Sequence, residues 1–384
     1  MSTSSERKAA FNAAFEPIVE AFVADCRDTH EMPSAATDWI GSMLRYTCVG
    51  GKMSRALLVV TTLGRLNGGE PVSGETLADA HAVGWCIELL QAYFLVADDV
   101  MDNSEMRRGQ PCWYRRPDVG LIAVNDAFIL KSCLFSTLRR RFASRPALHS
   151  ALIELFNEVT LQTELGQLLD LQTQPPNGRT NLAVCDAKRY HSIVKYKTAF
   201  YTIWLPVAGA LILSDQHIPA VIAVAKPLAM RIGVYFQVQD DFLDCYGDYA
   251  TLGKIGTDII EGKCSWLLVT ALQQLRTAAA GAGAEAAQAQ TTLASLTEHY
   301  GINERQGATA AEVVEHETIV KALFAELELE AAYKAYEEAS AAEIQAMIDA
   351  QSEASCAARG GAPALSCGMA IYQDILDKLY GRDK

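Results

Sequence analysis

The stretch AHAVGWCIELLQAYFLVADDVMD, from Ala80 to Asp102, is apolar over about five helical turns or more and ends in three aspartates. Residues four apart share one face of an α-helix, so Asp98 and Asp102 project together, and Asp99 lies about 100° round the axis. Carboxylates this close disfavour each other's ionisation unless a cation compensates. The stretch therefore predicts a long, largely buried helix whose last turn carries an acidic cluster.

A second stretch, FQVQDDFLD from Phe236 to Asp244, repeats this pattern with Asp240, Asp241 and Asp244. Hard divalent cations take oxygen ligands, and Mg²⁺ combines one or two carboxylates with water and substrate phosphate. Solvated helix ends are the alternative interpretation, but both clusters end apolar runs, and the same pattern occurs twice. Two such clusters facing each other would hold Mg²⁺ with a diphosphate between them.

Helical periodicity dominates the remaining chain. FNAAFEPIVEAFVADCRD places Phe11, Phe15, Val19 and Phe22 at spacings of three and four, which predicts one apolar stripe. ALIELFNEVTLQTELGQLLDLQT has the same character, and strand-like alternation is scarce. We expect an all-α fold, a bundle of about ten or more helices packed around a central cavity or core.

Breakers and linkers bound the domain organisation. Gly- and Pro-rich stretches at 66–75, 173–180 and 245–258 predict loops, and the Ala/Gly/Gln-rich stretch at 277–292 predicts a low-complexity surface insertion. No linker divides the chain, so we expect a single domain over residues 1–384.

Composition excludes several classes. The 384 residues are half hydrophobic and carry a formal net charge of −13 with no obvious basic face, so we expect no nucleic-acid partner. The longest apolar stretch, Val83 to Ala97, is short for a span of about 20 residues, and we expect no transmembrane segment. The ten cysteines lack CxxC spacing and predict buried free thiols. We expect a cytoplasmic protein, with organelle targeting left open.

Basic residues gather in short motifs: RRGQPCWY after the first cluster, GGKMSR with Lys52 and Arg55, KYKT with Lys197 and Thr198, and GKIGTD with Lys254. Arginine makes bidentate contacts to phosphate, and lysine supplies a point charge. GKMSRALL lacks the spacing of a phosphate-binding P-loop, which makes a nucleotide kinase a poor interpretation.

These motifs, together with VGLIAVNDAF, QTELGQLLDL and GKIGTDIIEGKCSWL, run from about residue 44 to 270 in the order found in a known family. The chain resembles the trans-prenyltransferases, the isoprenyl diphosphate synthases. The resemblance implies a helical bundle around a deep central apolar pocket, usually in a homodimer. It also implies three Mg²⁺ ions per active site, with Mn²⁺ as another possible ion.

By this resemblance the site residues fall into four groups. Direct metal ligands are Asp98, Asp102 and Asp240, with Asp99, Asp241 and Asp244 as further ligands or their supports. The allylic diphosphate contacts Arg107, Lys197 and Lys254, and Lys263 lies near the second cluster. Isopentenyl diphosphate contacts Lys52, Arg55, Gln91 and Arg108 in a site without metal. Thr198, Gln237 and the Lys197 carbonyl face the developing carbocation.

The implied reaction condenses dimethylallyl diphosphate, and then geranyl diphosphate, with isopentenyl diphosphate to give farnesyl diphosphate. Tyr93 and Phe94 precede Asp98 by five and four residues, so their rings lie roughly 6–8 Å deeper along the helix. We expect them to form the floor of the pocket and to stop growth near fifteen carbons.

Three alternatives stay open at this point. A terpene synthase on the same scaffold would ionise a prenyl diphosphate without extending it, and a related synthase would make geranyl or geranylgeranyl diphosphate. A non-catalytic regulatory subunit should have lost metal ligands, yet all six aspartates are present. Two departures from the family bear on the isopentenyl site: Ser54 stands where the family commonly has Asn, and the C-terminus, YGRDK, is weakly basic.

Overall fold

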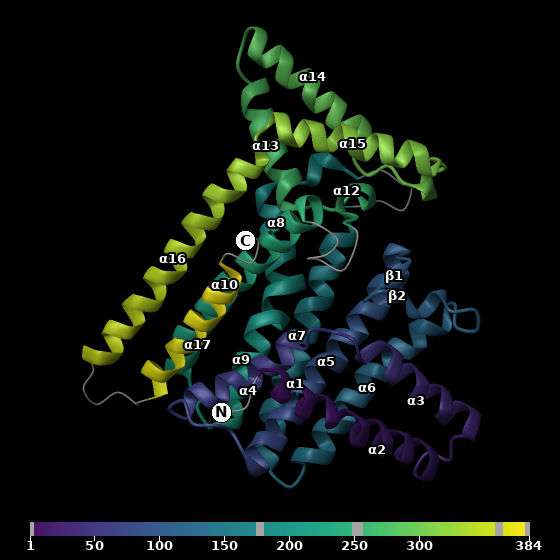
Figure 1. The fold of residues 1–384 in the computed structure, drawn as a ribbon, viewed down its shortest axis with the longest axis vertical. Helices are drawn as coiled ribbons and strands as arrows, with labels where there is room; N and C mark the ends of the chain where they lie inside the picture. The colour runs from purple at the N-terminus through teal and green to yellow at the C-terminus, as the bar shows by residue number, and fades with distance from the viewer. Residues whose placement is uncertain (1–3, 174–179, 248–255, 358–363, 381–384) are drawn as a thin grey trace. The chain divides into compact units, whose positions relative to one another are not determined.

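The computed structural model describes residues 4–173, 180–247, 256–357 and 364–380, and these are almost entirely helical (Figure 1). The all-α prediction is confirmed. The elements are α1 (Ser4–Ala13), α2 (Phe15–Asp28), α3 (Ser34–Cys48), α4 (Ser54–Leu66), α5 (Gly74–Asp102), β1 (Met106–Arg107), β2 (Gln110–Pro111), η1 (Trp113–Arg115), α6 (Ile122–Phe142), α7 (Pro146–Leu171), η2 (Leu182–Val184), α8 (Ala187–Ile193), η3 (Val194–Trp204), α9 (Leu205–Leu213), α10 (Pro219–Tyr246), α12 (Asp258–Glu261), α13 (Trp266–Ala279), α14 (Ala284–His299), η4 (Glu304–Gln306), α15 (Ala310–Glu326), α16 (Leu329–Ala357) and α17 (Ala364–Leu379).

Helix α5 is the long buried helix predicted from Ala80–Asp102. It begins earlier, at Gly74, and every residue from Ala82 to Leu90 is buried. It ends at Asp102, because the next residue, Asn103, adopts the left-handed conformation (φ 58°), and the Asn103 N–H donates to the Asp99 carbonyl. Asparagine tolerates this conformation better than most residues. The acidic cluster therefore occupies the last turn, as predicted.

The N-terminal apolar stripe forms two helices, not one, since the chain breaks at Ala14 between α1 and α2. Pro17, in the first turn of α2, accounts for the break, because its ring would clash with the carbonyl of Ala13 in a continuous helix. Phe11 and Phe15 both stack on the Trp85 ring of α5, at centroid distances of 4.6 and 4.2 Å. Phe22, by contrast, is only half-buried.

The chain divides into two compact units, each made of separate segments. The first contains Met1–Thr160, Tyr201–Pro227 and Gln351–Tyr372, and the second contains Leu161–Phe200, Leu228–Ala350 and Gln373–Lys384. In the first unit α5 packs against α4, α6 and α9, and α2 packs against α3 (Figure 1). The single-domain organisation stays a prediction.

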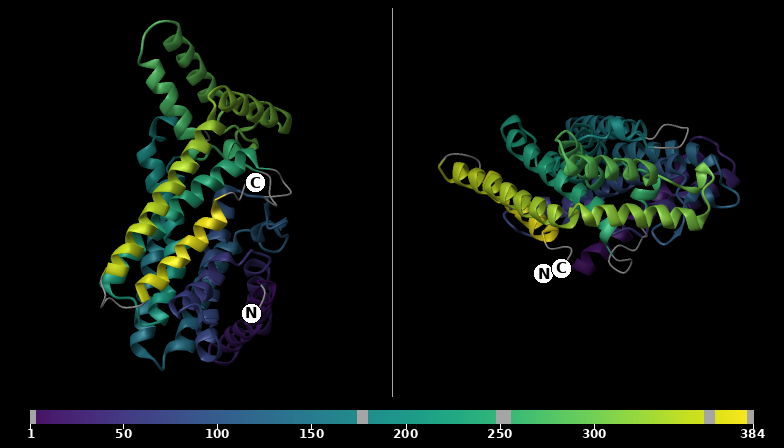
Figure 2. Two further views of the ribbon diagram at one scale, coloured as in Figure 1. Left: turned by 60° about the vertical axis from the view of Figure 1, so that its left-hand side comes forward. Right: turned by 90° about the horizontal axis from the view of Figure 1, so that it is seen from above.

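In the second unit α13 and α14 form a helical hairpin, drawn in green in Figure 2, and α14 also packs against α15. The stretch 277–292 lies in this hairpin. It is helical except at the connection 280–283, and Ala286, Ala289 and Thr292 are buried. Alanine and glutamine are good helix formers, which explains why a low-complexity composition is ordered here.

Three helical segments are long and apolar enough to cross a membrane by length and composition: Gly74–Asp102, Ala187–Leu213 and Pro219–Tyr246. In their most apolar windows 67%, 78% and 44% of the residues are buried inside the protein, so much of this apolar surface already packs against other helices. The absence of a transmembrane segment stays a prediction. The eight cysteines whose side chains are described are all free, and seven of them are buried.

Candidate active site

The first aspartate cluster lies at the end of α5, and its three carboxylates differ in exposure. The Asp98 side chain is 21% exposed, whereas that of Asp99 is 4% exposed, and Asp102 is buried. The Arg107 guanidinium contacts Asp99 through Nε (3.0 Å) and Nη2, and lies 4.0 Å from Asp98. Burial raises the pKa of Asp99, and Arg107 opposes that shift.

Arg107 and Arg108 belong to a tight β1–β2 hairpin in which Met106 pairs with Pro111. Arg108 and Gly109 have φ values of 54° and 76°, the left-handed geometry that two-residue hairpin turns require. The turn sends the two guanidinium groups to different partners. Arg108 Nη1 donates to the carbonyls of Thr47 (3.2 Å) and Val49 (2.9 Å), just before the loop that carries Lys52.

The other predicted isopentenyl residues lie in the same unit. Lys52 is exposed. Arg55 donates to the hydroxyls of Tyr201 (3.0 Å) and Thr202 (3.0 Å), with its guanidinium 4.6 Å from the Tyr201 ring centre. With its amide oriented to satisfy both neighbours, Gln91 accepts from Arg55 (3.1 Å) and donates to the buried Glu88 (3.1 Å). The structure thus brings Arg55 and Gln91 together.

The predicted floor residues, Tyr93 and Phe94, are half-buried on α5. Their ring centres lie 4.9 Å apart, and Phe94 also contacts Tyr201 at 6.0 Å. Lys131 lies 5.4 Å above the Tyr93 ring. These aromatic rings form one cluster in the first unit.

The second aspartate cluster lies near the end of α10, where Asp240 is half-buried and the other two carboxylates are buried. Asp241 accepts hydrogen bonds from the Tyr190 hydroxyl (2.7 Å), the Gln237 amide (2.7 Å) and the Trp266 N–H (2.8 Å). Burial raises the pKa of Asp241 to about 7, although these donors favour its charged form.

Asp244 is contacted by the backbone of residues 256–258. It accepts from the Asp258 N–H at 2.9 Å. A Cβ atom at Gly256 would lie 1.7 Å from the Asp244 carbonyl oxygen, so only glycine allows this approach.

The segment KYKT lies in η3, a π-helix that two other helices approach closely, each at a glycine. A Cβ atom at Gly166 of α7 would lie 2.1 Å from the Lys197 nitrogen, and one at Gly233 of α10 would lie 2.7 Å from the Ala199 Cα. Such π-helical turns are frequent at functional sites. Here the geometry brings the Thr198 hydroxyl to the Gln237 amide oxygen, to which it donates at 2.8 Å.

Asp170 is a site residue that sequence reasoning missed. Fully buried at the end of α7, it accepts from Lys197 Nζ at 2.6 Å and lies 3.5 Å from Lys263 Nζ. Burial alone would raise the pKa of Asp170, but the two ammonium groups outweigh it and hold the pKa well below its usual range. A signal existed: Asp170 is the lone charge in the last turn of a leucine-rich helix, within QTELGQLLDL.

One predicted site residue, Lys254, lies outside the described residues.

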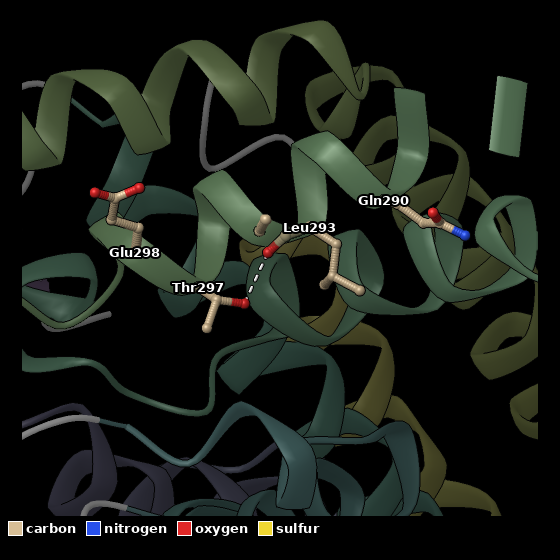
Figure 3. A pocket seen from close by; sticks show the side chains of 5 residues that line it. Gln290, Leu293, Thr297 and Glu298 are labelled. Carbon is tan, nitrogen blue, oxygen red and sulfur yellow. Dashed lines mark hydrogen bonds between the residues drawn. The ribbon is translucent and has the colours of Figure 1, made fainter. Parts of the chain in front are cut away.

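A cavity of about 470 Å³ lies on α14, which carries none of the predicted site residues. It is lined by Gln290, Leu293, Ala294, Thr297 and Glu298 (Figure 3). It includes none of the predicted site residues and no cluster of titratable groups, so we assign it no part in catalysis.

The donor set fits a hard divalent ion. Both clusters offer only carboxylate oxygens, which suit Mg²⁺, and contain neither His nor Cys. Within the residues that the structure describes, no three His, Cys, Asp or Glu side chains converge on one point. An ion bound here would take one or two carboxylates and complete its shell with water and phosphate oxygens, as Mg²⁺ does.

Carboxylates that suit Mg²⁺, together with arginine and lysine side chains, are the groups that a phosphate-binding enzyme needs. The chain belongs to the polyprenyl synthetase family, whose model matches residues 37–300.

Its relatives are similar over most of their length. The chain is 39% identical to a farnesyl pyrophosphate synthase of Penicillium aethiopicum over 97% of each chain. It is 42% identical to the farnesyl pyrophosphate synthase of Homo sapiens, over 90% of this chain and 76% of the human one. The T. brucei farnesyl diphosphate synthase complexed with risedronate has a TM-score of 0.80 at 34% identity, over 98% of this chain and 100% of that one.

Proposed function

We propose that this chain is a prenyltransferase that makes farnesyl diphosphate. It condenses dimethylallyl diphosphate with isopentenyl diphosphate, and then extends the geranyl diphosphate formed by one further unit. The observation that carries this proposal is the pair of aspartate clusters, each near the end of an apolar helix, with Arg107 in the unit of the first and Lys197 in the unit of the second. The family and the names of the relatives support the same activity.

Enzymes of the polyprenyl synthetase family use a divalent metal, generally Mg²⁺. When bound, the metal would neutralise the charge that develops on the leaving diphosphate. We assign direct ligation to Asp98, Asp102 and Asp240, and three ions to each active site. Asp99 and Asp241 are already held by protein donors, which suits a role in orienting their neighbours.

Arg107, Lys197 and Lys254 bind the allylic diphosphate in this proposal. The Lys197 side chain is already positioned before substrate binds, because Asp170 contacts its ammonium and the close approach of Gly166 fixes its backbone. Pre-organised charges of this kind stabilise a transition state without a reorganisation cost. As the allylic C–O bond breaks, these cations retain the diphosphate near the carbocation.

Thr198 and Gln237 stabilise the carbocation in this scheme. The Thr198 hydroxyl donates to the Gln237 amide oxygen, and the Gln237 amide nitrogen donates to Asp241. The hydroxyl proton of Thr198 thus points toward Gln237. The lone pairs of the threonine oxygen therefore remain available to positive charge, as does the Lys197 carbonyl. The double bond of isopentenyl diphosphate then forms the new C–C bond, and the released diphosphate takes the proton lost from the adduct.

Isopentenyl diphosphate binds through Lys52, Arg55, Gln91 and Arg108. Arg55 and Gln91 are already joined to each other and to Glu88, which aligns them before binding. Aligning the two substrates converts a bimolecular step into an effectively unimolecular one.

Products separate the proposal from its alternatives. With labelled isopentenyl diphosphate, dimethylallyl diphosphate and Mg²⁺, the expected product has fifteen carbons. A terpene synthase would release hydrocarbon or alcohol without chain extension, and that outcome would contradict the proposal.

Phe94 sets the length of the product in this proposal. Phe94→Ala removes the ring that contacts both Tyr93 and Tyr201, so we expect products of twenty carbons or more. The matched control is Phe22→Ala, which removes a half-buried ring on α2 and should leave the product unchanged. Chromatography of the dephosphorylated products is the measurement. If Phe94→Ala makes products of unchanged chain length, Phe94 does not form the floor of the pocket.

We also propose a homodimer. In the first unit Leu121, Ile122 and Phe128 at and near the start of α6 are 76%, 51% and 59% exposed, and in the second Leu161, Leu165 and Leu168 of α7 are 46–55% exposed. Large exposed apolar side chains that recur on one helix favour a protein partner. Sedimentation of the 41.7 kDa chain tests this directly, and a monomer at micromolar concentration would contradict it.

A further inference from the structure

The loop that carries Lys52 receives a cation from the N-terminal helix. Lys8 of α1 donates from Nζ to the Gly51 carbonyl at 3.2 Å, across 43 residues of sequence. Gly51 immediately precedes Lys52, one of the residues assigned to isopentenyl diphosphate. None of the motifs in the sequence indicated a role for α1.

Lys8 reaches the loop because α1 docks on α5 in a fixed register. Phe11 is fully buried, its ring is nearly parallel to that of Trp85 (6°), and the Trp85 indole donates to the Phe11 carbonyl at 2.9 Å. Lys8 lies one turn before Phe11, and Glu88 lies one turn after Trp85. The charge of Lys8 acts on Glu88, as do those of Arg55 and Arg108.

Glu88 explains why a cation is held at this position. Its side chain is almost fully buried, and burial raises its pKa, while Arg55, Arg108 and Lys8 lower it. A buried carboxylate is costly unless charges and donors surround it. The residues facing it come from α1, α4 and the β1–β2 hairpin, and Gln91 of α5 donates to it.

The loop itself is held at alternate carbonyls. Arg108 binds the carbonyls of Thr47 and Val49, and Lys8 binds that of Gly51. Gly50 and Met53 both have positive φ, at 86° and 57°. Because a methionine at positive φ is strained, external contacts must hold this conformation.

We propose that Lys8 is a positioning residue of the isopentenyl diphosphate site: its bond to Gly51 fixes the loop that presents Lys52. This inference rests on the proposed function, because that function assigns Lys52 its substrate. It gives the N-terminal helix a part in binding one substrate and none in binding the other.

The test compares three variants on the same helix. Lys8→Ala removes the contact, Lys8→Arg restores a cation that can donate to the carbonyl, and Arg7→Ala removes the neighbouring exposed cation. The net contribution of a typical intramolecular hydrogen bond corresponds to about a threefold to tenfold effect on affinity. We expect Lys8→Ala to raise KM for isopentenyl diphosphate by that factor, with KM for geranyl diphosphate and kcat nearly unchanged.

Hydrogen exchange supplies a readout that does not depend on activity. Amides of residues 49–54 should exchange faster in Lys8→Ala than in the wild type, and Arg7→Ala and Lys8→Arg should match the wild type. An unchanged KM together with unchanged exchange in Lys8→Ala would overturn the inference. Equal rises in KM for both substrates would also overturn it. If the wild type does not condense geranyl diphosphate with isopentenyl diphosphate, the proposed function is rejected. The hydrogen-exchange rates would still decide whether Lys8 holds the loop.

Discussion

The two aspartate clusters share one sequence pattern, yet their middle residues are held in opposite ways. Asp99 in the first unit contacts a cation, Arg107. Asp241 in the second unit accepts from three uncharged donors instead: a phenol, an amide and a backbone N–H. Lys197 and Lys263 of the second unit contact a separate acid, Asp170.

The two units therefore position the cations proposed to bind a diphosphate in two different ways. In the first unit the acid and the base neutralise each other, so a ligand that binds one of them changes the environment of the other. In the second unit Asp170 holds Lys197 independently of the aspartate cluster. We infer that the first cluster responds more to substrate and metal, and that the second is the more rigid of the two.

The largest effect should come from the outer carboxylates. Asp98→Ala and Asp240→Ala each remove a proposed metal ligand on an accessible carboxylate, and we expect kcat/KM to fall about a thousandfold. Chelation of the metal should abolish activity in the wild type. Steady-state kinetics across a Mg²⁺ titration is the measurement.

The matched control for these variants is Asp377→Ala, an exposed aspartate on α17, which should retain full activity. If the first cluster is the more responsive, Asp98→Ala should also shift the Mg²⁺ concentration for half-activity further than Asp240→Ala. Full activity in either site variant would refute the assignment of that cluster to metal.

The next effect concerns Asp170. Asp170→Asn leaves Lys197 and Lys263 without their buried countercharge, and breaking a buried ion pair costs about 3 kcal/mol of unfolding free energy. We expect that loss at neutral pH, together with a higher KM for the allylic substrate. Chemical denaturation measures the first quantity, with Asp377→Asn as the control.

The same variant predicts a pH dependence. The pKa of Asp170 lies below its unfolded value, so its contribution to stability is fully present above about pH 4 and is lost as the pH falls through the folded pKa. The stability difference between wild type and Asp170→Asn should therefore be constant near neutral pH and shrink below about pH 4. A difference that grows on acidification would contradict the arrangement.

Periodicity and spacing were sufficient to predict the helical fold and both aspartate triplets. They also contained the signal for the break at Ala14, since Pro17 removes a backbone N–H and its ring clashes with the carbonyl of Ala13, the last residue of α1. They could not predict that Phe11 and Phe15 share the Trp85 indole. Nor could they predict the π-helix Val194–Trp204. Its cause is the close approach of Gly166 and Gly233, which come from two other helices.

The sequence alone also could not predict which residues contact Asp99 and Asp241. Arg107 follows Asp99 by eight residues, and the chain leaves α5 through Asn103, in the left-handed conformation, before Arg107 contacts that carboxylate. Tyr190 and Trp266 lie far from Asp241 in sequence and reach it through packing of the second unit. One-dimensional spacing identifies which acids cluster, and tertiary packing decides how each of them is neutralised.

The smallest predicted effect tests that difference in neutralisation. Tyr190→Phe removes one of the donors to Asp241, and Arg107→Gln removes the cation beside Asp99; each should lower the unfolding free energy by about 1–2 kcal/mol. The Arg107 side chain is 33% exposed, so added salt should screen its charge, and the deficit of Arg107→Gln should shrink between about 0.05 and about 0.5 M salt. Tyr190 is buried and uncharged, and its deficit should not change with salt. Urea denaturation at both salt concentrations gives the four values, and an identical salt response in the two variants would show that the clusters are neutralised alike.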